Sequence, residues 1–367
     1  MKGQDIYEEL MHHLSKLAMS YAPREDLIQI LKENFSPEEA KVVLALPSYI
    51  IPLQGASISE ISKNSDLSLD KLKIILGNLS ARGLIYSCKD EKEGERKYAI
   101  NQPGYGFPQT FFWKAEATAH SKNMAKHILK YFNNEVTKEV FGSSPIPYRF
   151  VPVDETIEPD IQSVLPYQVM NKIIENARVI AVANCSCRVI AKLIGRDCGH
   201  PLEVCMKFNE LAEYIIEKGF ARQISKEEAK KISKGASEAG LVHFVDNTID
   251  KVLQNCNCCG CSCWNLGRIK RRKIPRDEII ATYFIRNTIE DNCVGCGNCI
   301  DICPADAVHL VDTIAQVERN WCIGCGVCVS KCPNDAIKIV VRDDLKNKIP
   351  EKTFEELHQK ILENRCE

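Results

Sequence analysis

The chain has 367 residues, of which 45% are hydrophobic and 26% are charged, and this balance allows a buried core and two or three domains. The net charge is −1, so the overall charge of the chain does not favour binding to nucleic acid or to an anionic membrane. The polar start MKGQDIYEEL is unlike a signal peptide, and no run of 18 apolar residues occurs. We therefore expect a cytoplasmic protein without a membrane span.

The first region, residues 1–103, is predicted to be mainly helical. An amphipathic helix is expected over residues 5–21, and another begins at Pro37 with Ser36 as its N-cap. Ser57 and Glu60 form a capping box before a short helix. A longer helix follows Ser68 and stops at Gly83, with this predicted apolar face: Leu69, Leu72, Ile75, Leu76 and Leu79. Two strands around a charged turn, KDEKEGE, complete a β-hairpin.

Helix, helix, turn, helix and hairpin in this order resemble a winged-helix domain of the MarR-like and ArsR-like type over residues 36–100. The resemblance implies that the third helix could enter a DNA major groove. Its predicted exposed residues are only mildly basic: Asp70, Lys71, Lys73, Asn78, Ser80 and Arg82. Strong DNA binders carry more cations for phosphates, so we favour a protein-contact role over nucleic-acid binding.

The second region, residues 104–277, is predicted to be a Cys-rich α/β domain. Helices are expected over residues 111–134, 169–177 and 225–239, and the Pro-rich stretch 145–166 favours an extended linker. The apolar runs RVIAVAN and LVHFV predict buried strands, and the first delivers Cys185 and Cys187 at its end.

The third region, residues 278–342, contains the bacterial run C-x2-C-x2-C-x3-C-P twice, before a polar helical tail, residues 343–367. In such runs the fourth cysteine ligates the other cluster, so one [4Fe–4S] cluster takes Cys293, Cys296, Cys299 and Cys332. The second takes Cys322, Cys325, Cys328 and Cys303. Four glycines should turn backbone N–H groups toward the cluster sulfides: Gly295, Gly297, Gly324 and Gly326.

This repeat resembles the two-cluster bacterial ferredoxins over residues 292–341, with a cysteine at every ligand position. Zinc ribbons use pairs of C-x2-C rather than triplets ending in C-P, so zinc is disfavoured here. The fold class expected for the whole chain is therefore multidomain α+β: a winged-helix-like domain, a Cys-rich α/β domain and a two-cluster ferredoxin domain.

Nine of the 19 cysteines lie in the middle region and are predicted to be further iron–sulfur ligands. The first group is Cys185, Cys187, Cys198 and Cys205, and the second is Cys256, Cys258, Cys259, Cys261 and Cys263. One cluster per group, or two clusters with ligands exchanged between the groups, both agree with the spacing. A structural zinc ion and a redox-active disulfide are the alternatives. An unusual cluster, or an iron open to substrate, is also compatible with the fifth thiol.

Several residues near these cysteines have two interpretations. Arg188 either donates to or neutralises a cluster, or is an ordinary surface residue. For His200 and His243 a structural role is favoured over a ligand role. Cys88 and Cys366 stand apart and are interpreted as a small buried residue and a tail thiol.

The run RIKRRKIPR, from Arg268 to Arg276, has six basic residues in nine. It could steer an acidic redox partner, compensate the negative charge of a nearby cluster, or contact nucleic acid.

The arrangement as a whole resembles multi-cluster ferredoxin-domain proteins of anaerobic bacteria and archaea, which implies electron transfer. We expect an electron-transfer protein or subunit that serves a partner redox enzyme, rather than a stand-alone enzyme. Two alternatives remain: an oxidoreductase with a catalytic cluster in the middle domain, and a redox-responsive DNA-binding regulator. Neither a Rossmann fingerprint nor a Walker loop is present, so no nucleotide-binding motif is apparent.

Overall fold

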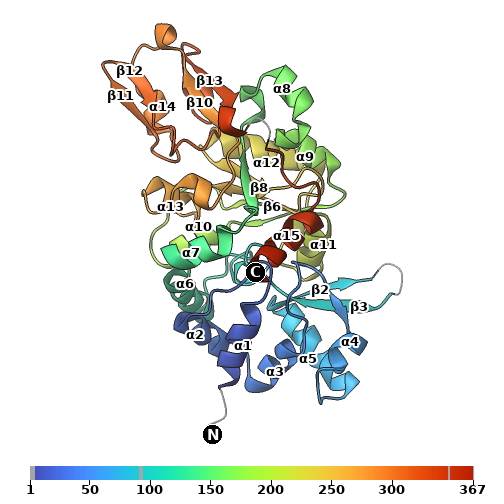
Figure 1. Cartoon of the computed structure of the whole chain (residues 1–367). Helices are drawn as coiled ribbons and strands as arrows, with labels where there is room; N and C mark the ends of the chain where they lie inside the picture. The colour runs from blue at the N-terminus through green and yellow to red at the C-terminus, as the bar shows by residue number, and fades with distance from the viewer. Residues whose placement is uncertain (1–4, 91–93, 346–347, 367) are drawn as a thin grey trace.

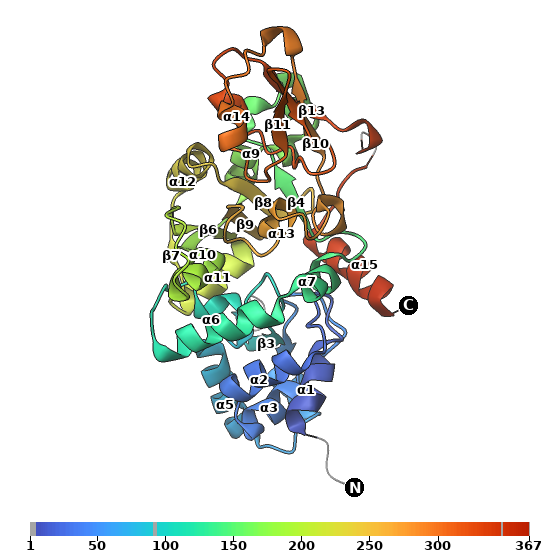
Figure 2. The same ribbon diagram turned by 90° about the vertical axis from the view of Figure 1, so that its left-hand side faces the viewer.

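The computed structural model describes residues 5–90, 94–345 and 348–366. The molecule is elongated, with the N-terminal helices at one end, a six-stranded sheet in the middle and the Cys-rich C-terminal module at the other end (Figures 1 and 2). No helix among these described residues is long and apolar enough to cross a membrane.

The N-terminal part consists of five helices and a small sheet. The helices are α1 (Ile6–Leu14), α2 (Glu25–Asn34), α3 (Pro37–Leu44), α4 (Ile58–Ser62) and α5 (Leu69–Ala81). The antiparallel sheet has the order β1 (Ala56–Ser57), β3 (Arg96–Ile100), β2 (Ile85–Lys89). The N-cap at Ser36 and the capping box at Ser57 are confirmed, and so is the stop at Gly83, whose φ is +74°. Residues 91–93 of the charged turn lie outside the described residues.

Three details of the N-terminal prediction were wrong. The helix expected over residues 5–21 already ends at Leu14, after which the chain turns and is buried from Leu17 to Ala22. Leu69 is 51% exposed because it lies at the first position of α5, outside the packed stripe. Ser80 is fully buried and its hydroxyl pairs with that of Ser87, 2.7 Å away, so it is not on the exposed face.

The middle part is built on an antiparallel sheet of order β4-β8-β9-β6-β5-β7. The strands are β4 (Tyr148–Val151), β5 (Ile180–Asn184), β6 (Glu203–Phe208), β7 (Arg222–Gln223), β8 (Val242–Asp246) and β9 (Gln254–Cys258). The helices are α6 (Ala119–Tyr131), α7 (Asn134–Phe141), α8 (Pro159–Val164), α9 (Met170–Asn176), α10 (Ser186–Leu193), α11 (Asn209–Glu217), α12 (Lys226–Glu238) and α13 (Leu266–Lys270).

Side chains alternate between the two faces of this sheet, and each face has its own core. Met206 and Val245 belong to the core under α9 and α12. Phe244 and Ala183 belong to the opposite face, together with residues of α10 and α11 and of the N-terminal helices. The thiol-bearing side of the sheet is thus continuous with the core of the N-terminal part.

The predicted strands at 180–184 and 242–246 and the helices at 170–176 and 226–238 are confirmed. Two other expectations were wrong. The helix predicted from Phe111 begins only at Ala119, where Thr118 and Ser121 form a capping box. The stretch 145–166 is not throughout an extended linker or loop, because its residues 148–151 form the edge strand β4, paired with β8.

The C-terminal module has two antiparallel strand pairs. β10 (Phe284–Thr288) pairs with β13 (Ile337–Val341), β11 (Val308–Val311) pairs with β12 (Ile314–Val317), and α14 (Asn298–Asp301) is a single short helix. The tail helix α15 (Phe354–Cys366) packs back on the middle of the molecule, as expected for a helical tail (Figure 1). The side chain of Cys366 lies outside the described residues. The short 3-10 turns are Gln109–Phe111, Asp154–Thr156, Pro166–Gln168, Arg276–Glu278, Glu290–Asn292, Val329–Lys331 and Asp343–Leu345.

Candidate iron–sulfur and thiol sites

The outer end of the C-terminal module contains a small cavity lined with thiols. Its cysteines are Cys293, Cys296, Cys299 and Cys332. The backbone N–H of Ala315 donates to Cys293 Sγ (3.4 Å), and that of Ala336 donates to Cys332 Sγ (3.3 Å). The structure therefore brings together three cysteines of the first run and the last cysteine of the second.

The other four cysteines of the module gather at its inner end. Burial raises the pKa of the Cys325 thiol, and the neighbouring thiols of Cys328, Cys303 and Cys322 raise it further. Ala307 N–H donates to Cys303 Sγ (3.3 Å). The predicted unusual backbone of the four glycines is confirmed, since φ lies at +66° in Gly295, +79° in Gly297, +63° in Gly324 and +77° in Gly326.

Arg286 on β10 is the residue that sequence reasoning missed in this module. Its side chain is 1% exposed, lines the outer cavity, and its three guanidinium nitrogens have no hydrogen-bond partner among the described residues. An unpaired buried cation is strongly unfavourable. An anionic cluster with thiolate ligands would supply the missing charge, so the residues fit the group. The available signal was an arginine inside the apolar strand FIRNT just before the first cysteine run.

A second thiol-rich cavity lies on one face of the central sheet. Its cysteines come from both sequence groups: Cys185, Cys187, Cys205, Cys256, Cys258, Cys259 and Cys263. Cys258 Sγ and Cys263 Sγ are 3.4 Å apart, and Cys187 contacts both Cys185 and Cys263. The two sequence groups are therefore not separate sites.

Strand pairing explains this mixing. β6 and β9 are neighbours, and their register places Cys205 level with Cys256. Cys258 follows two residues later on the same face, while Cys185 lies at the end of β5, on the other side of β6. The spacing of the cysteines along the sequence does not reveal which strands pair, so this mixing could not be predicted from it.

Two buried cations face this cavity, Arg188 and Lys207, both 2% exposed. Burial opposes the charged form of each, yet the nearby thiolates prevail. Cys185 and Cys259 raise the pKa of Arg188, and Cys205 and Cys256 raise that of Lys207. The surface interpretation of Arg188 was therefore wrong. Lys207 was missed, although it stands in the apolar strand EVCMKF beside a cysteine.

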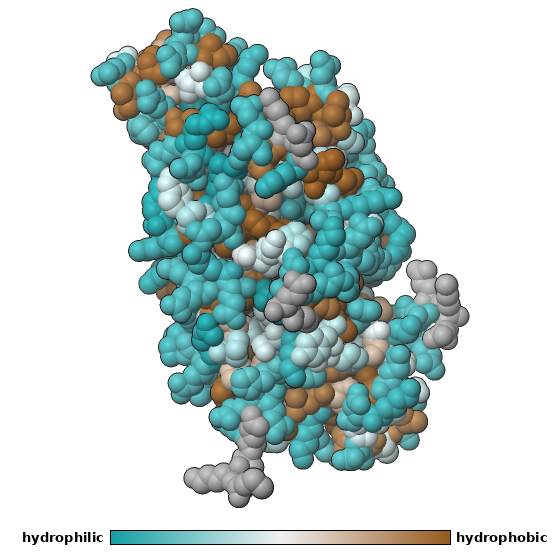
Figure 3. Space-filling view, in the orientation of Figure 1, coloured by the Kyte–Doolittle hydropathy of each residue, from teal (hydrophilic) through white to brown (hydrophobic). Residues whose placement is uncertain are grey.

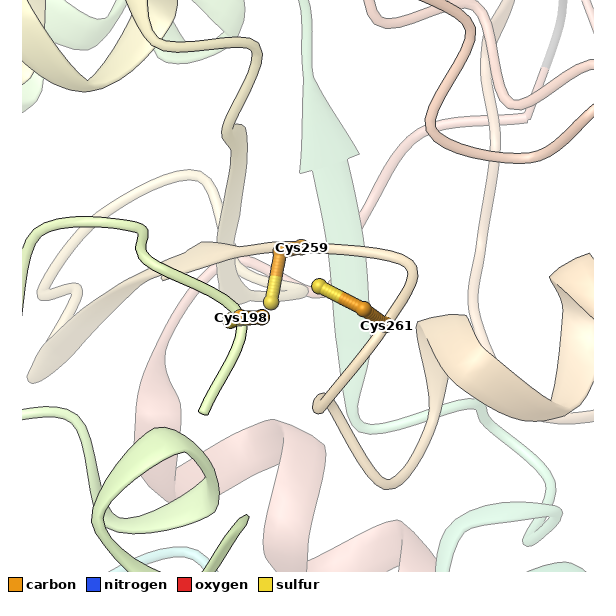
Figure 4. Close-up of side chains that lie close together, drawn as sticks. All are labelled: Cys198, Cys259 and Cys261. Carbon is orange, nitrogen blue, oxygen red and sulfur yellow. The ribbon is translucent and has the colours of Figure 1, made fainter. Parts of the chain in front are cut away.

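A third group of thiols lies at the rim. The Sγ atoms of Cys198, Cys259 and Cys261 lie within 4.8 Å of one another and point toward a common centre (Figure 4). Ser262 Oγ donates to Cys198 Sγ at 3.3 Å. Cys259 borders both this group and the larger cavity.

The structural role favoured for His243 is confirmed, and that of His200 stays a prediction. His243 is buried on β8, where Nδ1 is 2.7 Å from Asn257 Oδ1 and Nε2 is 2.9 Å from Ser237 Oγ. His200 is half-buried, and its backbone N–H, rather than its ring, interacts with Cys198. Cys88 is half-buried on β2, far along the chain from the thiol sites.

The basic run lies between the middle part and the C-terminal module. Lys270 pairs with Asp306 (3.1 Å), and Arg272 donates to the carbonyls of Ala305 (2.8 Å) and Asp306 (2.7 Å). Arg276 is buried and donates to the carbonyl of Cys322. Most of the run thus fastens the cysteine module to the sheet, while Arg271 and Lys273 remain exposed.

The comparisons with known proteins bear on the C-terminal module. Residues 287–339 match the family described as "4Fe-4S dicluster domain". No curated protein matches the chain. The match, together with the cysteines gathered around two centres, shows that the C-terminal part of this chain is a ferredoxin-like iron–sulfur domain.

Proposed function

We propose that this chain is an electron-transfer protein in which two [4Fe–4S] clusters exchange electrons with a further redox centre in the middle domain. The ligands of the outer cluster are Cys293, Cys296, Cys299 and Cys332. Those of the inner cluster are Cys322, Cys325, Cys328 and Cys303. Bound clusters would supply one-electron chemistry, and the protein supplies their order, burial and charge environment.

The contact between the two thiol-bearing parts carries this proposal. Gly260, in the loop between Cys259 and Cys261, packs so closely that an added Cβ would lie 2.1 Å from the carbonyl oxygen of Pro304. Pro304 directly follows Cys303, a ligand assigned to the inner cluster. Val153 N–H also donates to the carbonyl of Cys325 (3.0 Å). The inner cluster site therefore packs directly against the loop that carries Cys259 and Cys261 and against the segment that follows β4.

The larger cavity is suited to a cluster rather than to isolated thiols. Six cysteines other than Cys259 line it, and two buried cations oppose the negative charge that such a centre would carry. We assign an additional iron–sulfur cluster to this cavity, with ligands drawn from Cys185, Cys187, Cys205, Cys256, Cys258 and Cys263.

Metal analysis of protein purified without oxygen tests the cluster count. Iron well above the about eight ions of two cubanes, with matching acid-labile sulfide, supports the proposal. About eight irons per chain would leave the middle cavity without a cluster and would contradict it.

Gly260→Ala tests the contact itself. The added methyl collides with the Pro304 carbonyl, so the loop must move at a cost of about 1–3 kcal/mol. We expect rapid-freeze EPR to show reduction of the middle centre slowed several-fold or more, with the ferredoxin signals still appearing at the wild-type rate. Gly235→Ala is the matched control, because a Cβ at Gly235 in α12 meets nothing within 4 Å. Equal rates in both variants would show that electrons do not cross this contact.

A second candidate, catalysis at the middle centre, is favoured by the surplus of thiols over the four that a cubane needs. An iron that binds an external ligand would respond to cyanide or carbon monoxide. A change in the EPR signal of the middle centre, with the ferredoxin signals unaltered, would support this function.

For the N-terminal part, we propose a winged-helix-like module that contacts protein. Lys71 on α5 pairs with Glu38, and Arg82, the C-cap of α5, pairs with Glu39, so both of these cations already have partners. The same helix exposes Leu69 (51%) and Ile74 (64%), which suit an apolar contact better than phosphates. A gel-shift titration with random duplex DNA should show no salt-dependent binding, whereas a steep salt dependence would favour the regulator.

A further inference from the structure

The rim group of Cys198, Cys259 and Cys261 is a compact set of three thiols, whereas the close approach in the larger cavity joins the pair Cys258 and Cys263, 3.4 Å apart. Its three Sγ atoms lie within 4.8 Å of one another. Among the described residues, no other three His, Cys, Asp or Glu side chains bring their ligand atoms this close. The eight cysteines of the ferredoxin-like domain, which surround two clusters, are therefore more widely spaced than this group.

This spacing matches a single metal ion. Zinc–sulfur distances are about 2.3 Å, so two thiolates on one zinc ion lie at most about 4.6 Å apart and about 3.8 Å in a tetrahedral site. A four-iron cluster instead binds each thiolate at a different iron, which holds the sulfurs further apart. The rim group thus needs only a slight contraction to close on one ion.

Strand geometry directs Cys258 and Cys259 to different sides, although Cys259 also borders the larger cavity. Cys258 ends β9 and faces the larger cavity, and the next residue, Cys259, turns toward Cys198 and packs with Val204 and Leu241 on the α12 side. Cys261 follows in the loop after Gly260 and is exposed. Two adjacent cysteines therefore serve two different centres.

The local charges also suit a mononuclear site. A divalent ion with three thiolates carries one net negative charge, and the guanidinium of Arg188 faces Cys259 from the interior. Ser262 Oγ donates to Cys198 Sγ at 3.3 Å, and a hydrogen bond of this kind orients a ligand sulfur.

We propose that Cys198, Cys259 and Cys261 bind one zinc ion whose fourth coordination position is open to a small thiol from solution. Structural zinc sites are closed by four protein ligands, whereas an open position is typical of sites that bind an exogenous ligand. No fourth His, Cys, Asp or Glu of the described residues joins the group, and Cys261 is exposed. A metal held by three sulfurs favours a soft fourth ligand. This inference does not depend on the proposed function.

Metal analysis of single variants tests the ion and its ligands. Wild-type protein purified without oxygen should contain about one zinc per chain. Cys261→Ser and Cys198→Ser should lose most of it while iron, sulfide and the EPR spectrum stay at wild-type levels. Cys88→Ser, which changes a cysteine away from the site, should retain both metals. Wild-type protein without zinc, or loss of iron in Cys261→Ser, would overturn the proposal.

Cobalt substitution tests the open position. Co²⁺ in place of zinc should give sulfur-to-cobalt charge-transfer bands, and adding ethanethiol should shift the visible d–d bands in a saturable manner. Cobalt bands that do not respond to ethanethiol would show a closed site and overturn the open position. The iron content of the same samples reports the cluster count independently of the cobalt bands. A failure of the zinc proposal can therefore be distinguished from a failure of the proposed middle cluster.

Discussion

At the scale of single residues, two buried arginines beside the thiol sites indicate where a negatively charged group would bind. Arg286 and Arg188 are 1% and 2% exposed, and each has guanidinium nitrogens without a hydrogen-bond partner among the described residues. Such placement is unfavourable unless an anion lies beside the cation. Under the proposed function, a cluster beside each arginine would supply this anion.

Replacing Arg286 with Gln should lower the reduction potential of the outer cluster, because the buried positive charge favours the more negative, reduced state. Loss of the charge partner should also destabilise the domain by about 3–5 kcal/mol. EPR-monitored redox titration and thermal unfolding measure the two effects. Arg286→Lys should recover most of the potential, and Arg319→Gln is the control because Arg319 is an exposed arginine of the same domain. An unchanged potential in Arg286→Gln would mean that its charge does not reach the cluster.

At the scale of elements, the tail helix α15 is attached through a buried histidine. His358 is fully buried, its Nδ1 is 2.9 Å from the carbonyl oxygen of Phe354, and its ring packs against those of Tyr105 and Phe354. Burial lowers the pKa of His358 to about 4. The folded protein therefore holds this imidazole neutral, whereas the unfolded chain protonates it near pH 6.5.

The sign of the pH effect follows from this difference. The contribution of His358 to stability is fully present above about pH 6.5 and is lost as the pH falls toward about 4, by up to about 3 kcal/mol. Hydrogen exchange of the α15 amides, corrected for intrinsic rates, should show weaker protection at about pH 5 than at about pH 7. His358→Phe should remove this dependence, and His12→Phe, at an exposed position, should not. The same pH dependence in His358→Phe and wild type would assign it to another group.

Local elements were predictable where a short pattern determines them, and pairing across the sheet was not. The capping residues Ser36 and Ser57 and the repeated cysteine run act within a few residues of themselves. The middle cysteines depend on the registers of β5, β6 and β9, which pair residues 19 to 49 positions apart along the chain. For the same reason, the position of β4 within an apparent linker and the burial of Arg286 became visible only in the folded chain.

At the scale of the whole molecule, the thiol centres form a series from an exposed tip to the interior. The outer site lies at the far end of the C-terminal module, where Cys296 is exposed and Val294 is 63% exposed. Leu310 and Val311 on β11 are also exposed, and hydrophobic residues gather at this end of the surface (Figures 1 and 3). The inner site is instead enclosed by the sheet domain through Val153 and Arg276. Under the proposed function, we expect an external donor to reach the outer cluster first.

A charge placed at the tip should therefore control the rate of reduction from outside. In Val294→Asp, electrostatic repulsion should slow the bimolecular reduction by dithionite, an anionic donor, several-fold at low salt, and high salt should remove the effect. With the cationic methyl viologen radical as donor the same variant should react faster, since the sign of the interaction reverses. Stopped-flow bleaching of the cluster absorption measures both rates. Ile74→Asp, an equally exposed position on α5 in the N-terminal part, should leave both rates unchanged. If Val294→Asp matched wild type with both donors while Ile74→Asp did not, electrons would enter from the opposite end, and the outer cluster would be an exit rather than the entrance.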